Sequence, residues 1–300
     1  MSVFNRLLVT TLPLVPKGIV RRVASRYVAG ETLDDAVQTV RDLNAQGAMA
    51  TLDVLGEEVH EREKADAAVE EYLRVFAAIS AQKLDSNVSI KPTMLGLKID
   101  EGFCRDNIER IVATAKEHGN FVRIDMEDRT TTDATLRIYR DLHARYGNVG
   151  VVLQAYMRRT LRDIEELPEQ GANVRICKGI YVEPREAAWK GYDTVRANYV
   201  EALEKLIVRG VYPAIATHDE YLACRGVALV DQHGLPRDRY EFQMLLGVDE
   251  ELRRILIAGG HRLRVYVPYG RDWYAYSIRR LRENPEVARH VLRAMLSRRT

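Results

Sequence analysis

Two adjacent arginines near the C-terminal end are placed to bind a small carboxylate. Residues at i, i+3, i+4 and i+7 share one face of a helix, and here these positions hold Tyr276, Arg279, Arg280 and Glu283. Two guanidinium groups beside an aromatic ring can hold a carboxylate through paired hydrogen bonds. A charged helix face by itself more often lies in water, so the rest of the sequence must decide between the two interpretations.

Polar side chains also follow short apolar runs, at the points where strands are expected to end. They are Lys91, Asp125, Glu127, Gln154, Arg175, Lys178, Thr217, His218, Asp219 and Gln243. Each of them alone could be an ordinary end group of a strand. Their concentration at so many strand ends predicts a functional site, because a purely structural sheet has no need of them.

The residue types at these strand ends narrow the chemistry. His218 and the nearby acidic residues form no HxH or HExxH pattern, so a catalytic metal is not expected. No GxSxG elbow supports serine hydrolysis, and no GxGxxG turn supports a Rossmann dinucleotide domain. The pair Lys178-Gly179 would let the backbone approach a ligand beside a cation. Lys91 or Lys178 could also form a Schiff base, which leaves a lysine-dependent lyase of the aldolase type open.

The elements that must position these residues alternate along the chain. Eight apolar runs, typical of strands, cover residues 48–55, 88–91, 121–125, 149–155, 173–178, 212–217, 240–246 and 262–267. Helical patterns lie between them, for example at 59–82 and at 194–208, where Asp193 is expected to cap the helix. Eight strand–helix units in roughly 250 residues predict an α/β fold, a (β/α)8 TIM barrel, in preference to a doubly wound sheet with fewer strands.

The pattern within and before the strands refines this prediction. The runs at 121–125, 173–178 and 262–267 alternate polar and apolar residues, which predicts polar side chains inside the barrel. Residues 18–46 carry a helical pattern that is interrupted at Gly30. The sequence therefore predicts an N-terminal helical arm over 1–46 and a catalytic barrel domain over 47–300.

Composition and charge exclude several classes of protein. The 300 residues include 45 basic and 43 acidic side chains, a net charge of +2 that argues against a dedicated nucleic-acid binder. Three separated cysteines without a CxxC pair indicate reduced thiols in a cytoplasmic protein. The apolar stretch at 7–20 contains two prolines and a lysine, so neither a membrane span nor secretion is expected. The basic, amphipathic end at 289–299 is compatible with a peripheral contact to the inner face of the cell membrane.

The strand-end motifs resemble those of the proline dehydrogenase family, the flavin enzymes that oxidise L-proline, in its short monofunctional bacterial form. In chain order the motifs are Leu55-Gly56-Glu57, Ile90-Lys91, Ile124-Asp125, Gln154-Ala155-Tyr156, Arg175 with Lys178-Gly179-Ile180-Tyr181, Ala216-Thr217-His218, Tyr240-Glu241-Phe242-Gln243, Tyr266-Val267-Pro268 and Tyr276-x-x-Arg279-Arg280-x-x-Glu283. Each motif is short, but the complete series is specific. The resemblance implies a (β/α)8 barrel with FAD at its mouth, extra N-terminal helices, and a last barrel helix over the pocket.

The resemblance also implies roles for individual residues. Asp125 and Arg175 match active-site positions, with Arg175 beside the flavin N5. The substrate L-proline would be bound by Lys91, Leu245, Tyr266, Tyr276, Arg279 and Arg280, the two arginines holding its carboxylate. The flavin would contact Met126, Gln154, Arg175, Lys178, Gly179, Tyr181, Thr217, His218 and Gln243. Glu57 and Glu283 would act as a gate that closes the pocket through a helix arginine.

The implied reaction is the oxidation of L-proline to 1-pyrroline-5-carboxylate, the first step of proline degradation to glutamate. Hydride would pass to the flavin N5, and the electrons would pass on to a membrane quinone. Lys91 and Asp125 are both candidates for managing the proton of the substrate amine. Two alternatives remain: the lysine-dependent lyase, and a barrel that serves only as a binding scaffold. The arginine pair and the polar strand ends argue against the scaffold. The sequence does not indicate an oligomeric state.

Overall fold

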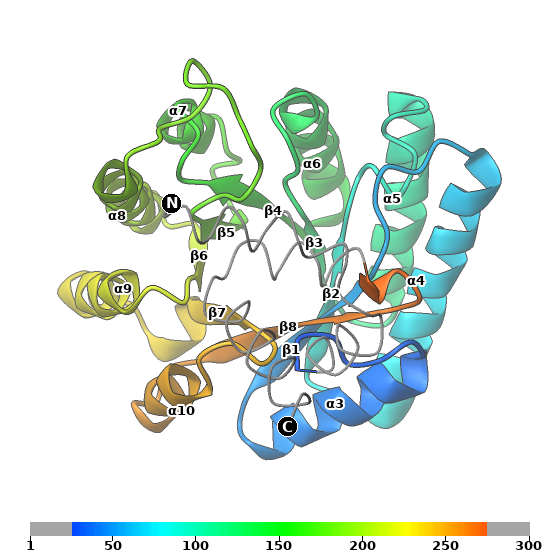
Figure 1. Cartoon of the computed structure of the whole chain (residues 1–300), viewed down its shortest axis with the longest axis horizontal. Helices are drawn as coiled ribbons and strands as arrows, with labels where there is room; N and C mark the ends of the chain where they lie inside the picture. Colours follow the sequence, from blue (N-terminus) through cyan, green and yellow to red (C-terminus); the bar gives the residue numbers. More distant parts are fainter. Residues whose placement is uncertain (1–25, 275–300) are drawn as a thin grey trace, which may run out of the picture.

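Eight parallel strands close into a barrel that helices surround (Figure 1). The structure is a computed structural model, and it describes residues 26–274. In chain order the strands are β1 (Met49–Val54), β2 (Ser86–Ile90), β3 (Val122–Ile124), β4 (Val149–Gln154), β5 (Asn173–Cys177), β6 (Tyr212–Ala216), β7 (Glu241–Leu245) and β8 (Leu263–Tyr269). Each strand pairs with the next one, and β8 pairs with β1. The expected (β/α)8 barrel is therefore confirmed, with strand boundaries that shift by a few residues.

Helices fill the connections between the strands and pack on the outside of the barrel (Figure 1). They are α3 (Leu33–Ala45), α4 (Arg62–Gln82), α5 (Glu101–Glu117), α6 (Thr132–Tyr146), α7 (Thr160–Glu165), α8 (Tyr192–Val208), α9 (Glu220–Gln232) and α10 (Glu250–Ala258), with a 3-10 helix η2 (Arg237–Arg239) before β7. No helix within residues 26–274 is long and apolar enough to cross a membrane.

Local sequence signals set the starts of several helices. Thr32 and Asp35 form a capping box before α3, in which the Asp35 amide donates to Thr32 Oγ1 at 3.2 Å. Asp249 caps α10 by accepting from the amide of Leu252 at 3.1 Å. The expected cap at Asp193 is wrong, because α8 begins at Tyr192 and its cap position is a glycine. Asp193 lies in the first turn, where its carboxylate still interacts favourably with the helix dipole.

The apolar core lies between the outer face of the strands and the inner faces of the helices. Tyr72 and Phe76 on α4 and Tyr139 on α6 are fully buried there, and Val37 and Val40 of α3 belong to the same core. Truncation of a buried aromatic such as Phe76 to alanine costs about 3–5 kcal/mol. α3 ends close to the domain boundary expected at residue 46, but its apolar side chains pack into the same core as the barrel. Residues 1–25 of the arm and the helix expected over the pocket fall outside residues 26–274.

The inside of the barrel carries charges, as the alternating runs predicted. Arg123 on β3, Arg175 on β5 and Arg264 on β8 are each at most 7% exposed. Buried charges are costly unless they are paired and hydrogen-bonded, and these arginines have partners. Arg264 Nε donates to both carboxylate oxygens of Glu241, at 3.0 and 3.1 Å. Arg123 Nη1 donates to two backbone carbonyls, at 3.1 and 2.6 Å.

Candidate active site

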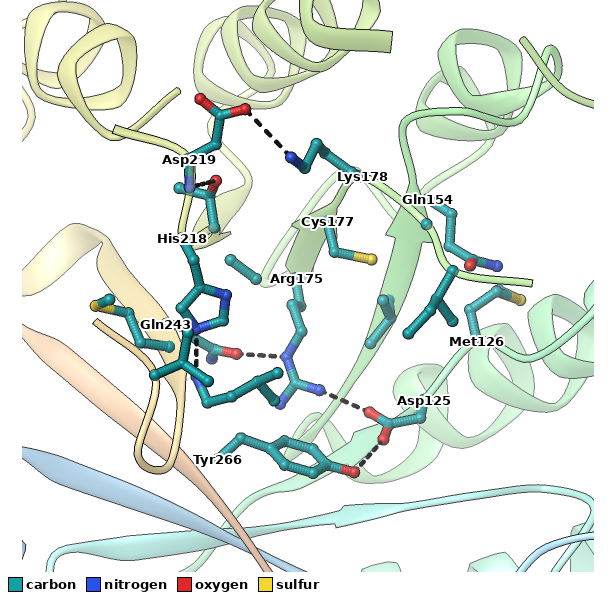
Figure 2. Close-up of a pocket in the computed structure, with 18 of the residues that line it drawn as sticks. Asp125, Met126, Gln154, Arg175, Cys177, Lys178, His218, Asp219, Gln243 and Tyr266 are labelled. Carbon is teal, nitrogen blue, oxygen red and sulfur yellow. Dashed lines mark hydrogen bonds and ion pairs between the residues drawn. The ribbon is translucent and has the colours of Figure 1, made fainter. Parts of the chain in front are cut away.

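A cavity of about 880 Å³ opens at the carboxyl ends of the strands. Figure 2 shows side chains from several strands converging on it. The residues proposed from the sequence that line this cavity are Lys91, Asp125, Met126, Gln154, Arg175, Lys178, Gly179, Tyr181, Thr217, His218, Gln243, Leu245 and Tyr266. The barrel thus brings together residues that are up to 175 positions apart in the chain. Their individual roles remain predictions.

Arg175 is held at the cavity by three side chains, one for each guanidinium nitrogen; Figure 2 shows two of them, Asp125 and Gln243. Nη1 donates to Asp125 Oδ1 at 2.7 Å, and Nη2 donates to Ser89 Oγ at 2.9 Å. Nε donates to Gln243 Oε1. Every nitrogen of the planar group is therefore engaged, which fixes both its position and its plane.

Tyr266 connects two charged groups of the same region. Its hydroxyl donates to Asp125 Oδ2 at 3.0 Å and accepts from Lys91 Nζ at 3.3 Å. The guanidinium carbon of Arg175 lies 5.3 Å from the centre of the tyrosine ring. We call Asp125, Arg175, Gln243 and Tyr266 the cavity floor. Its hydrogen bonds leave the Tyr266 ring with a defined orientation.

Lys91 forms a buried ion pair with Asp53 of β1. Its Nζ lies 2.6 and 2.7 Å from the two oxygens of Asp53, whose side chain is fully buried. Burial by itself lowers the pKa of Lys91, but the carboxylates of Asp53 and Asp125 outweigh it and raise that pKa. Lys91 is therefore an ammonium group at neutral pH.

A second charged group lies at the edge of the cavity, between β5, α8 and β6. Asp219 accepts from Lys178 Nζ at 3.2 Å, from Tyr192 Oη at 2.9 Å and from Arg196 Nη2 at 2.6 Å. Burial alone would raise the pKa of Asp219, but these donors hold it well below its usual range. We call these four residues the rim cluster. Because it contains two cations and one carboxylate, the rim cluster carries a net positive charge, which suits a phosphate-bearing ligand.

Backbone geometry fixes two further residues of the cavity. His218 Nε2 accepts from the amide of Leu245 at 2.7 Å, which fixes the orientation of the ring (Figure 2). Gly179 has a φ of +103°, and a Cβ atom there would lie 2.1 Å from the ring of Tyr156. The glycine is therefore required by the packing of Tyr156, in addition to any close approach of a ligand.

The described part of the chain offers no evident metal site. Within residues 26–274, no three His, Cys, Asp or Glu side chains come close enough to hold a metal ion. Cys177 also lines the cavity, and burial raises the pKa of its thiol to about 11. It is therefore a neutral thiol at pH 7, with little reactivity as a nucleophile.

Some proposed residues are not brought to the cavity by the structure as described. Tyr276, Arg279, Arg280 and Glu283 lie outside residues 26–274. Glu57 is exposed in the connection after β1 and does not line the cavity. Its charge does act on Glu127, whose pKa burial raises to about 7 with a smaller contribution from Glu57.

Four residues that bind Lys91, Arg175 or Asp219 through their side chains were not proposed from the sequence. Asp53 had a signal, because it is the single charged residue in the apolar run at 48–55. Ser89 had a weaker one, since it stands two positions before Lys91 and so faces the same side of a strand. Tyr192 and Arg196 stand at i and i+4 on α8, and nothing local in their sequence distinguishes them from a solvated face.

Comparison with known proteins gives a consistent result. The family model described as proline dehydrogenase matches residues 36–293. Proline dehydrogenase 2 of Bacillus subtilis (strain 168) is 40% identical over 265 residues, which cover 88% of this chain and 88% of that protein. The proline dehydrogenase of Deinococcus radiodurans is 39% identical over 278 residues, which cover 91% and 90% of the two chains.

A solved structure agrees with the fold. Proline utilization A (PutA) from Bdellovibrio bacteriovorus, in a crystal structure of the protein inactivated by N-propargylglycine, aligns with a TM-score of 0.82 at 24% identity. The alignment covers 88% of this chain and 33% of the other, so this chain spans about a third of that longer protein. The family model and the identity to two proline dehydrogenases over most of their length show that the chain belongs to the proline dehydrogenase family.

Proposed function

We propose that this chain oxidises L-proline to 1-pyrroline-5-carboxylate, the first step of proline degradation to glutamate, with FAD bound in the cavity. Family membership supports the reaction. The observation that carries the proposal is the fixed guanidinium of Arg175, held by Asp125, Ser89 and Gln243 at the strand ends. A preorganised cation stabilises negative charge that develops beside it. FAD, when bound there, would supply an N5 atom able to accept hydride from the substrate.

The cavity lining fits an elongated anionic cofactor. Its volume is in the range of sites for large ligands, and the rim cluster supplies positive charge at one edge. Arg175 supplies a further cation at the floor. The residues that would hold FAD are Met126, Gln154, Arg175, Lys178, Gly179, Tyr181, Thr217, His218 and Gln243. Arg196 and Tyr192 of the rim cluster would add to them.

The substrate would lie on the side of the cavity floor that faces away from the rim cluster. Leu245 and Tyr266 offer apolar and aromatic surface for the pyrrolidine ring, and Lys91 offers positive charge. Two further arginines, Arg279 and Arg280, would bind the carboxylate of proline and, with Tyr276, fix the ring orientation. Glu57 and Glu283 would form the gate.

The hydrogen bonds of the floor favour one candidate for the amine proton. The substrate amine must be neutral before hydride leaves the adjacent carbon. Lys91 is an ammonium and can only donate, as it does to Tyr266 Oη. Asp125 is the acceptor in the same group, with Oδ1 engaged by Arg175 and Oδ2 by Tyr266. We therefore infer that Asp125 and the Tyr266 hydroxyl manage this proton.

The same contacts disfavour a lysine-dependent lyase. A Schiff base requires a neutral amine, whereas Asp53 and Asp125 keep Lys91 protonated. Lys178 Nζ is engaged by Asp219 in the rim cluster. Borohydride reduction in the presence of candidate carbonyl substrates tests this alternative directly, since a lyase would be trapped with added mass on Lys91 or Lys178.

The electron acceptor is proposed on resemblance to the family. Reduced flavin must pass on its electrons, and we propose a membrane quinone as the acceptor. This assigns the chain to the cytoplasm, with a peripheral contact to the inner face of the cell membrane. Flotation with liposomes that contain a quinone, measured with and without L-proline, tests this part separately.

Colour is the decisive test of the main proposal. The purified protein should be yellow, and L-proline should bleach it without oxygen and support reduction of an artificial acceptor. D-proline provides the control, because with its carboxylate bound by the same groups it cannot present its Cδ–H, the hydride donor, in the same orientation. A colourless protein that cannot be reconstituted with FAD would overturn the proposal.

A further inference from the structure

A continuous line of hydrogen bonds runs through the barrel interior from Arg264 on β8 to Arg175 on β5. Arg264 Nε donates to Glu241 Oε1 at 3.0 Å. Gln243 Nε2 donates to the same carboxylate oxygen at 2.5 Å, and Gln243 Oε1 accepts from Arg175 Nε. Glu241 is 3% exposed and Gln243 is 4% exposed, so neither has ready access to water as an alternative partner. The side chain of Gln243 therefore links Glu241 to the floor arginine.

The two ends of this amide have opposite requirements. A glutamine side chain offers one oxygen acceptor and one NH2 donor, which can exchange places by rotation of the amide. Arg175 only donates, so it needs the oxygen. A carboxylate only accepts, so Glu241 needs the NH2 group. One orientation of the amide satisfies both neighbours. In the opposite orientation the NH2 group would face the donor of Arg175 and the amide oxygen would face the carboxylate of Glu241, which is costly for buried groups.

We propose that Glu241 is a positioning residue that sets the orientation of the Gln243 amide and through it holds Arg175 at the cavity floor. The proposal rests on the proposed role of Arg175 beside the flavin. Glu241 is not among the residues that line the cavity, so we assign it no direct contact with a bound ligand.

Glu241 itself is held firmly enough for this task. Its second oxygen accepts from Arg264 Nε at 3.1 Å and from Tyr212 Oη at 3.3 Å. Arg264 in turn donates from Nη1 to the carbonyl of Ala50 at 2.7 Å. Burial alone would raise the pKa of Glu241, but Arg264 and Gln243 hold it at about 2. The carboxylate is therefore ionised, and an acceptor only, at neutral pH.

The Nε–H proton of Arg175 reports directly on this contact. In the full-length, ¹⁵N-labelled protein as purified, its signal is identified by its loss in Arg175→Lys. Hydrogen exchange of this proton should be slow in the wild type, because it is buried and bonded. In Glu241→Gln, protection should fall roughly 10- to 100-fold, which is the effect of weakening one hydrogen bond to a charged group. Glu241→Asp keeps the charge beside Arg264 on a shorter side chain, and should also lose protection.

A swap of the two residues provides the rescue. In Glu241→Gln/Gln243→Glu, the carboxylate at position 243 offers an oxygen to Arg175 Nε whichever way it turns, so protection should return. Tyr212→Phe is the matched control, because Arg264 still holds Glu241, and it should keep wild-type protection. Wild-type protection in both Glu241→Gln and Glu241→Asp, or a swap that fails to restore it, would overturn the proposal.

The flavin potential separates positioning from a general structural role. Glu241→Asp changes no charge, so it should lower the potential only by moving the cation of Arg175. The same substitution in an Arg175→Met background should then cause no further shift. Equal shifts in both backgrounds would contradict the assignment. If the wild type binds no flavin, the proposed function fails, while the exchange experiment still decides the role of Glu241.

Discussion

Lys91 and Asp53 form an ion pair inside the barrel, with Nζ within 2.6 and 2.7 Å of the two carboxylate oxygens. Strand register brings them together. Asp53 on β1 stands opposite Ser89 on β2, and Lys91 follows two positions later on the same side of that strand. The pair keeps an ammonium group at the edge of a cavity that is otherwise arranged around Arg175. Asp53, together with Asp125, therefore keeps a proposed substrate-binding residue charged.

Asp53→Asn should destabilise the protein by about 3–5 kcal/mol, because it leaves the buried ammonium of Lys91 without its partner. Denaturant unfolding measures the change. The double variant Asp53→Asn/Lys91→Met removes both charges and should regain most of the stability without regaining proline oxidation. Glu101→Gln is the control, since it breaks an exposed pair with Arg137 that is screened by solvent and should leave the unfolding midpoint nearly unchanged. An unchanged unfolding midpoint in Asp53→Asn would contradict the buried pair.

Arg175→Ala should lower the reduction potential of the bound flavin, because it removes a fixed cation from the place where negative charge develops. The expected shift is on the order of 30 mV, equal to about 1.4 kcal/mol for a two-electron couple. Hydride transfer should slow on the order of 100-fold. Potentiometric titration and anaerobic stopped-flow reduction by proline give the two values. Arg137→Ala, far out on α6, should leave both unchanged, and a wild-type titration for Arg175→Ala would refute the role.

Arg279→Lys and Arg280→Lys should each weaken proline binding while the flavin stays bound. Lysine keeps the charge but loses the paired hydrogen bonds, at a cost of about 1.5–3 kcal/mol or roughly 10- to 100-fold in KM. Arg282→Lys is the control, because position 282 lies off the proposed face of the helix. Steady-state kinetics with proline give KM and kcat for each variant. Unchanged proline kinetics in both variants would rule out the carboxylate clamp.

The fold and the place of the site were predictable because they depend on local pattern. Near-continuous apolar runs such as 149–155 are typical of strands covered on both faces, and β4 is buried along its whole length. Polar residues such as Asp125 and Gln154 directly follow or end their runs, so a barrel necessarily gathers them at one mouth. Alternation around Arg175 likewise indicated its inward direction.

The pairings within the site were not predictable, because they depend on closure of the barrel. The partners of Lys91 and Arg175 come from other strands, and only the register of β1 with β2 brings Asp53 within reach of Lys91. Arg196 on α8 donates to Asp219, and no local sequence pattern indicates that these two residues are in contact. Gly179 shows a related limit: its requirement arises from the ring of Tyr156, which lies far from it in sequence.

Gly179→Ala should impair both stability and flavin binding. Alanine is strained at a φ of +103°, and its Cβ would lie 2.1 Å from the Tyr156 ring, so the ring or the loop with Lys178 must move. Gly119→Ala is a matched control at a φ of +61° with no atom within 4 Å, so it should cost only the backbone term of about 1–2 kcal/mol. Thermal unfolding and flavin titration compare the two. Equal effects of both substitutions would show that the contact with Tyr156 is unimportant.

Glu127→Gln should change how stability depends on pH. Glu127 is 4% exposed, and burial raises its pKa from 4.5 to about 7, although Thr93 donates to it through N and Oγ1. Between these two values the unfolded chain has lost the proton while the folded chain keeps it. The folded state therefore binds more protons, and its stability falls as pH rises through this window.

The size of this effect follows from the difference between the two pKa values. A separation of 2.5 units corresponds to a loss of about 3 kcal/mol between pH 4.5 and pH 7. Glutamine carries no titrating proton, so in Glu127→Gln the unfolding free energy should decline less over the same interval. Urea unfolding at half-unit steps of pH measures both slopes, and the difference between wild type and variant removes the contributions of all other groups. Parallel slopes would mean that Glu127 is ionised in the folded protein at pH 5, and that the hydrogen bonds from Thr93 outweigh its burial.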